Sequence, residues 1–90
     1  MMLQDAYLKA KKYAQIYDIN TRLDSCRDFG EFWGFMFIPS TGDPGDGIGY
    51  YTINKKTGEK SNFYPTMDFD LFERSIPVSI EQFAEYNVAI

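Results

Sequence analysis

Histidine is absent from this chain of 90 residues, and cysteine occurs once, as Cys26. The chain therefore lacks the commonest general base, the Ser–His and Cys–His nucleophile pairs and the commonest metal ligand. Because Arg27 follows Cys26 and a nearby cation lowers a thiol pKa, a reactive cysteine is one interpretation. We favour the other, a small core or edge residue, since lone cysteines behave mostly as hydrophobes. No pair of carboxylates is singled out for acid–base work, so we expect no catalytic residues and no enzymatic activity.

Acidic residues also occur in the glycine- and proline-rich stretch Pro39–Gly47, which is predicted to be one long loop. Asp43 and Asp46 do not keep the alternate-residue spacing of a calcium loop, and no closing Glu follows at the right distance. The glycines are not followed by the Gly-Lys-Ser/Thr of a phosphate-binding loop. We therefore expect a solvated turn cluster with neither a metal nor a cofactor.

A second group of acids alternates with apolar residues after Pro65. The acids are Asp68, Asp70 and Glu73, and the residues between them are Phe69, Leu71 and Phe72. Acids beside aromatic anchors are typical of a surface that docks a basic protein. A simpler interpretation, which the sequence favours, is that the aromatic residues are core and the acids only face water. If the segment is a docking site, we expect its contacts to be Asp68, Asp70, Glu73, Phe69 and Phe72, with Tyr50 as a further aromatic contact.

The overall composition limits the class of partner. Thirteen acidic residues against nine basic ones give a formal charge of −4, and no Lys/Arg cluster forms a phosphate-binding stripe. We therefore expect a basic protein as partner, and no nucleic acid. The longest apolar run, Phe32–Ile38, is far shorter than the ~20 residues that cross a bilayer, and the N-terminus lacks the order of a signal peptide. These features predict a soluble, cytoplasmic protein that does not bind a membrane.

The elements that must position these residues follow from apolar periodicity. Between Leu3 and Tyr17, apolar residues recur at spacings of three and four, which predicts a helix with Leu3, Tyr7, Ala10, Ala14 and Tyr17 on one side. Asp18-Ile19-Asn20 ends it, and Thr21–Arg27 is expected to be a short edge strand that uses Leu23 and Cys26 as core contacts. Asp28-Phe29-Gly30 is predicted to be a turn.

Glu31–Ile38 is a near-continuous apolar run, which favours a central strand or one covered on both faces. Trp33, Phe35 and Phe37 should share one face, while Phe32, Gly34, Met36 and Ile38 share the other. We expect Trp33 to be largely buried, because it lies midway along this strand.

The stretch Ile48–Tyr64 predicts a β-hairpin, with Lys55-Lys56-Thr57-Gly58 as its turn and Gly58 in the left-handed region. Ile48, Tyr50 and Thr52 should lie on one face of its first strand, with Gly49, Tyr51 and Ile53 on the other; the second strand is expected at about Glu59–Phe63.

The C-terminal third is predicted to be less regular. Thr66–Pro77 shows no clear period and is expected to be a loop with one helical turn. Ser79-Ile80-Glu81-Gln82 matches a capping box, so a short helix of roughly Ile80–Tyr86 should follow. The sequence therefore predicts one α+β domain, residues 1–90, in which an N-terminal helix packs on a three- to four-stranded antiparallel sheet and a short C-terminal helix follows.

Three of these stretches resemble the YrhB-like immunity-protein family. They are the Tyr/Ala-rich N-terminal helix, the aromatic strand Gly30–Ile38 (GEFWGFMFI) and above all Tyr51–Glu59 (YTINKKTGE), which leads to a short acidic C-terminal part. The family consists of small bacterial domains, many encoded beside polymorphic or contact-dependent toxins. The resemblance implies a non-enzymatic protein that binds and neutralises a cognate toxin, with Trp33, Ile53, Gly58 and Glu59 as structural positions. A small chaperone-like or regulatory protein-binding module is the alternative function.

Overall fold

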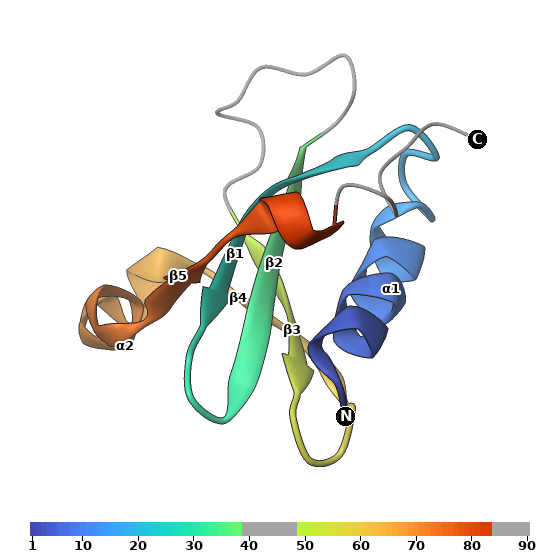
Figure 1. The fold of residues 1–90 in the computed structure, drawn as a ribbon. Coiled ribbons are helices and arrows are strands. Elements are labelled where there is room, and N and C mark those ends of the chain that lie inside the picture. Colours follow the sequence, from blue (N-terminus) through green and yellow to red (C-terminus); the bar gives the residue numbers. More distant parts are fainter. Residues whose placement is uncertain (39–48, 84–90) are drawn as a thin grey trace.

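The computed structural model describes residues 1–38 and 49–83, and the expected loop residues Asp43 and Asp46 lie outside this part of the chain. One helix is followed by a run of four strands and then by short helical segments, an order typical of an α+β protein (Figure 1). In chain order they are α1 (Leu3–Ala14), β1 (Arg22–Asp28), β2 (Phe32–Ile38), β3 (Tyr50–Asn54), β4 (Lys60–Phe63), the 3-10 helix η2 (Pro65–Met67), α2 (Phe69–Arg74), β5 (Ile76–Val78) and the 3-10 helix η3 (Ile80–Phe83). The N-terminal helix, the antiparallel sheet and the short C-terminal helix agree with the predicted fold class.

Within residues 1–38 and 49–83 the sheet has five antiparallel strands in the order β4-β3-β2-β1-β5, whereas the sequence predicted three or four. β5 is the added strand, and it pairs with β1 through Cys26↔Val78 and Asp28↔Ile76. β1 is therefore an internal strand, and its prediction as an edge strand was wrong. Three residues that include Pro77 carry too little periodicity to predict a strand, so only the pairing with β1 reveals it.

α1 covers one face of the sheet. Ala6, Tyr7 and Ala10 are fully buried against a core that includes Phe35, Ile53 and Phe83. α1 ends at Ala14 in a tightened turn. Gln15 N–H still donates four residues back to Lys11 O, but Ile16 N–H and Tyr17 N–H donate only three residues back, to Tyr13 O and Ala14 O. Tyr17 lies beyond the end of α1 and is 83% exposed, so its prediction as part of the apolar side of this helix was wrong.

The other face of the sheet carries a second core. Phe29, Tyr50 and Phe63 are buried there, and Phe32, Met36, Leu71 and Phe72 pack around them. The two faces of β2 and β3 divide as the alternation predicted, with Phe35 and Ile53 on the α1 side and Phe32 and Tyr50 opposite. Trp33 lies on the α1 side but is only partly buried, with Lys55 Nζ 5.0 Å from its ring centroid, so it is less buried than expected.

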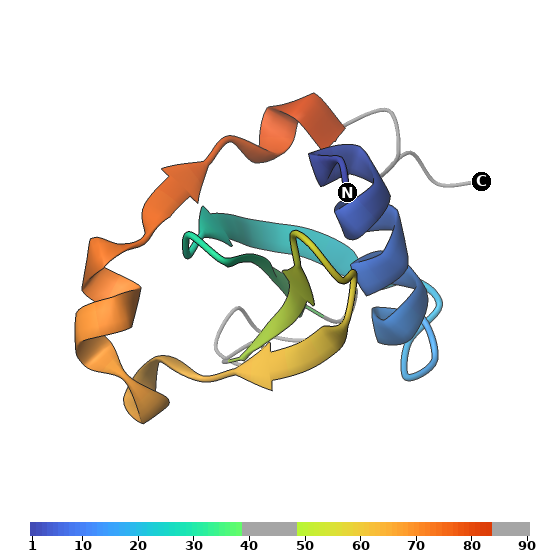
Figure 2. The ribbon, with the colours of Figure 1, turned by 90° about the horizontal axis from the view of Figure 1, so that it is seen from below.

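The chain crosses from one edge of the sheet to the other between β4 and β5. This crossover segment, residues 64–75, contains η2 and α2 and passes over the second core. Figure 2 shows α1 and α2 on opposite sides of the sheet. Thr66–Pro77 was predicted to be a loop with one helical turn; α2 supplies that turn, whereas Ile76 and Pro77 belong to β5.

The turns and the C-terminal helix agree in part with the predictions from the sequence. Gly30 and Gly58 have φ values of 96° and 71°, as the two predicted turns require. Near the C-terminus the Ser79 hydroxyl accepts from Glu81 N–H, while the Gln82 amide donates to the Ser79 carbonyl instead of completing a capping box. η3 is described as far as Phe83, and the predicted end of this helix at Tyr86 lies outside the described residues.

Candidate protein-docking site

Three acids and one aromatic ring are exposed on α2 and at its start. Asp68 caps the helix, because its Oδ1 accepts a hydrogen bond of 3.0 Å from the Leu71 amide. Asp70 and Glu73 are exposed, and the Phe69 side chain between them is 60% exposed. We call Asp68, Phe69, Asp70 and Glu73 the α2 surface. It brings together four of the six contact residues that the sequence predicted.

The other two predicted contact residues lie beneath this surface. Phe72 is partly buried and faces the sheet, with its ring centroid 6.2 Å from that of Tyr50. Tyr50 is only 4% exposed and also contacts Phe29. Its ring contact with Phe72 places it under the crossover segment, so the prediction of Tyr50 as a surface contact disagrees with its position.

Arg27 on β1 holds the C-terminal end of α2 against the sheet. Its Nε donates to Ser75 Oγ, its Nη2 donates to the Ser75 carbonyl at 3.1 Å, and its Cζ lies 4.6 Å from the centroid of the Phe72 ring. A guanidinium can make all three interactions at once because it is planar and has several donors. The α2 surface is therefore supported by side chains of the sheet.

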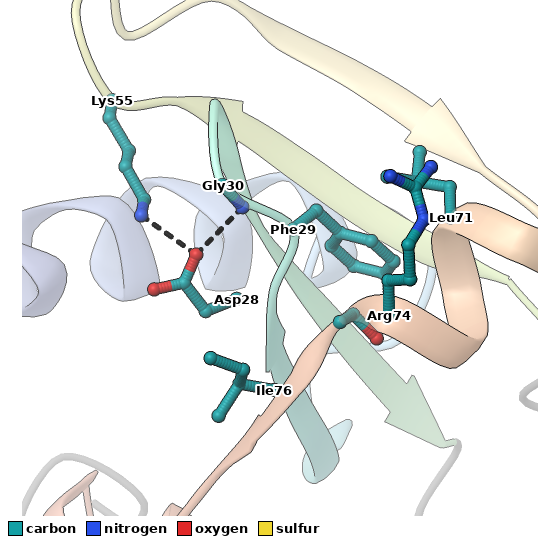
Figure 3. A pocket seen from close by; sticks show the side chains of 8 residues that line it. Asp28, Phe29, Gly30, Lys55, Leu71, Arg74 and Ile76 are labelled. Atoms are coloured by element: carbon teal, nitrogen blue, oxygen red, sulfur yellow. Dashed lines mark hydrogen bonds and ion pairs between the residues drawn. The ribbon is translucent and has the colours of Figure 1, made fainter.

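A cavity of about 360 Å³ opens between α2 and two turns of the sheet (Figure 3). Its walls come from the β1–β2 turn, the β3–β4 turn and the end of α2, and they include Asp28, Phe29, Lys55, Leu71 and Arg74. Figure 3 shows Asp28 and Lys55 on one side of the cavity, with the Phe29 ring between them and α2. The cavity therefore offers charged groups of both signs beside the α2 surface.

Asp28 joins the two turns that form this cavity. Its Oδ1 accepts from Lys55 Nζ at 2.7 Å and from the Gly30 amide at 2.8 Å. Burial by itself would raise the pKa of Asp28, but these two hydrogen bonds and the Lys55 charge outweigh it and hold the pKa below its usual value. The Asp28 carboxylate is therefore ionised at neutral pH and fixes the position of Lys55.

Several exposed apolar side chains that the sequence did not identify flank α2. Tyr64, Met67 and Ile76 are 44%, 65% and 65% exposed, and all three lie in the crossover segment or next to it. Apolar side chains of this kind are normally expected to be buried. The segment has no periodic pattern from which their exposure could have been predicted. The apolar part of the candidate site is therefore larger than the sequence indicated.

Cys26 is a core residue. Burial, and secondarily the Asp28 charge, raises the pKa of its thiol to about 12, which opposes formation of a reactive thiolate. Within residues 1–38 and 49–83, no group of three or more Cys, Asp or Glu side chains is placed to hold a metal ion. No helix in the same ranges has both the length and the apolar character needed to cross a membrane.

Comparison of this chain with protein-family models, with curated proteins and with solved structures finds no match in any of the three.

Proposed function

We propose that this protein is a non-enzymatic immunity protein that binds a basic protein toxin through the α2 surface and so neutralises it. The observation that carries the proposal is that Asp68, Asp70 and Glu73 are exposed on α2 or at its start, on the same short helix as the exposed Phe69 ring. Large exposed apolar groups rimmed by polar residues are typical of protein-binding sites.

The two kinds of side chain have separate roles in this proposal. The acids attract a basic partner over a distance and mainly raise the association rate. Phe69 supplies an apolar anchor, because an aromatic ring removed from water at the centre of an interface is a frequent hot spot. Arg27 holds Ser75 and Phe72, which limits the motion of α2 and lowers the entropic cost of binding.

The resemblance to YrhB-like immunity proteins is what points to a toxin within the wider class of basic proteins. It rests on the aromatic strand and on the hairpin YTINKKTGE, both of which are structural parts of the fold. The partner would then be encoded next to this chain, and the complex would form at a fixed stoichiometry.

A chaperone-like binding module is the second candidate, and the exposed Tyr64, Met67 and Ile76 favour it. Such side chains can hold exposed segments of several client proteins. Saturable binding to one neighbour-encoded protein supports the immunity function, whereas weak binding to many unfolded proteins supports the chaperone-like function.

Co-expression with the neighbour-encoded protein tests the proposed function. We expect the parent chain to restore growth of cells that express the neighbour-encoded protein. We expect Phe69→Ser to restore their growth poorly. Ile19→Ser is the matched control, since Ile19 is also an exposed apolar residue but lies in the α1–β1 connection. Equal protection by both variants, at equal protein levels, contradicts the assignment of the α2 surface.

A further inference from the structure

The two edges of the sheet differ in how readily they can accept another strand. Of the described strands, β4 and β5 lie at the edges. β5 has three residues and contains Pro77, which lacks an amide hydrogen, and proline disfavours strand addition to an edge. β4, Lys60–Phe63, contains no proline. Figure 2 shows β4 at the rim of the molecule, next to the start of the crossover segment.

The register shows which backbone groups of β4 point outward. Asn54 N–H donates to the Glu59 carbonyl at 3.0 Å, so residues 59, 61 and 63 are the ones that bond to β3. The alternation of an antiparallel ladder then directs the N–H and C=O groups of Lys60 and Asn62 away from β3. No described strand pairs with these groups.

Lysine on an edge strand often prevents strand addition, but Lys60 is turned away from this edge. Its Nζ lies 5.3 Å from the ring centroid of Tyr13 on α1 and 5.1 Å from that of Tyr51 on β3. These cation–π contacts hold the ammonium over the α1 face of the sheet. The charge therefore does not stand in the path of an incoming strand.

A groove of about 390 Å³ borders β4 on the opposite face. Phe32, Phe63 and Met67 give it apolar walls, Thr52 and Ser61 add hydroxyl groups, and Glu59 is the one charged residue among the described residues that line it. A lysine or arginine side chain matches this arrangement, because it combines an apolar stem with a cationic head.

We propose that β4 accepts an extended, basic segment of a partner protein as a sixth strand, and that the groove receives alternate side chains of that segment. Antiparallel addition would place side chains i, i+2 and i+4 of the segment beside Phe63, Ser61 and Glu59. The matching pattern is an apolar residue, then a small polar one, then a basic one, each separated by one residue. This site is distinct from the α2 surface, and the inference does not rest on the proposed function.

A synthetic peptide, acetyl-Thr-Leu-Thr-Ser-Thr-Arg-Thr-amide, is the probe, and amide chemical shifts of the isotope-labelled full chain are the readout. We expect saturable shifts at the Lys60 and Asn62 amides, with slower hydrogen exchange at both. Methylating the backbone nitrogens of the two threonines that flank the serine should weaken binding about tenfold, because those amides face β4. Methylating the serine nitrogen, which faces away, should weaken binding much less.

Two protein variants test the backbone and the charge separately. Asn62→Pro removes an outward amide and should weaken binding about tenfold, whereas the control Asn62→Ala keeps the amide and should bind like the parent. Glu59→Gln should abolish the preference for the arginine peptide over one with glutamate in its place. If Asn62→Pro does not fold, the methylated peptides decide the same question on the parent chain.

Two results overturn the inference. One is the absence of shifts at Lys60 and Asn62, or equal binding of all the methylated peptides. The other is concentration-dependent shifts at these amides without any peptide, which would show that a second copy of this chain occupies the edge. Peptide binding that survives neutralisation of Asp68, Asp70 and Glu73 separates this site from the α2 surface, so either proposal can fail without the other.

Discussion

The guanidinium of Arg27 lies over the ring of Phe72, with 4.6 Å between Cζ and the ring centroid, and so connects an internal strand to the helix that carries the acidic residues. Arg27 also donates to the side chain and carbonyl of Ser75. We expect Arg27→Ala to lower the free energy of unfolding by about 2 kcal/mol, because it removes charged hydrogen bonds and a cation–π contact. The amides of Phe72 and Ser75 should then exchange hydrogen faster.

Arg22→Ala is the matched control for this change, since Arg22 lies on the same strand and is exposed. Unchanged exchange of the α2 amides in Arg27→Ala would show that α2 is held by other contacts.

Gly58 is the residue on which the β3–β4 turn depends. Its φ is 71°, and an added Cβ would come within 2.9 Å of Met1 Cε. Gly58→Val should destabilise the protein by roughly 1–2 kcal/mol, the cost of left-handed geometry for a residue with a Cβ. Lys56→Val, at an exposed position of the same turn, should stay within about 0.5 kcal/mol of the parent in chemical denaturation. Equal denaturation midpoints for Gly58→Val and Lys56→Val would show that the positive φ at position 58 does not require glycine.

Two aromatic residues of β2, Phe35 and Trp33, differ in how deeply they are buried in the core between α1 and the sheet. Phe35 is fully buried and contacts Tyr7 and Phe83, whereas Trp33 is partly buried beside Lys55. Phe35→Ala should cost about 3–5 kcal/mol, and Trp33→Ala should cost about 2–3 kcal/mol because it leaves a smaller buried void. Denaturation followed by circular dichroism measures both. A larger loss for Trp33→Ala would contradict the finding that Phe35 is the more deeply buried of the two side chains.

The Asp28–Lys55 ion pair should give stability a specific dependence on acid. The pKa of Asp28 is lowered in the folded protein, so its contribution is present above the ordinary aspartate value of about 3.9 and is lost as the pH falls through the lowered value. The side chains of Lys55 and Asp28 are 27% and 32% exposed, which limits the contribution to about 1 kcal/mol or less.

Asp28→Asn provides the comparison for this pH dependence. Its difference in unfolding free energy from the parent should be constant near neutral pH and should shrink below about pH 4. A difference that stays the same across this range would show that Asp28 does not titrate as described.

Local sequence patterns predicted the parts of the fold that depend on alternation and on turns. The division of Phe35 and Phe32 between the two faces of β2 follows from a period of two, and Gly58 follows from the needs of a hairpin turn. These features are determined by residues close together in the chain.

Long-range pairing explains what the sequence did not predict. β5 becomes a strand only because β1 offers an edge, and β1 becomes internal for the same reason. The burial of Tyr50 and the exposure of Phe69 depend on the path of the crossover segment over the second core. A single sequence contains no local signal for that path, so four of the six predicted contacts lie on the α2 surface and two do not.

Acids on the α2 surface should speed association with a basic partner. The most direct test of this role is the association rate of the triple variant Asp68→Asn, Asp70→Asn and Glu73→Gln with the neighbour-encoded protein at two salt concentrations. Asparagine at position 68 keeps the helix cap, so the fold should persist. We expect the triple variant to associate more slowly than the parent at low salt and to show a flatter salt dependence. Association as fast as that of the parent at low salt would contradict it.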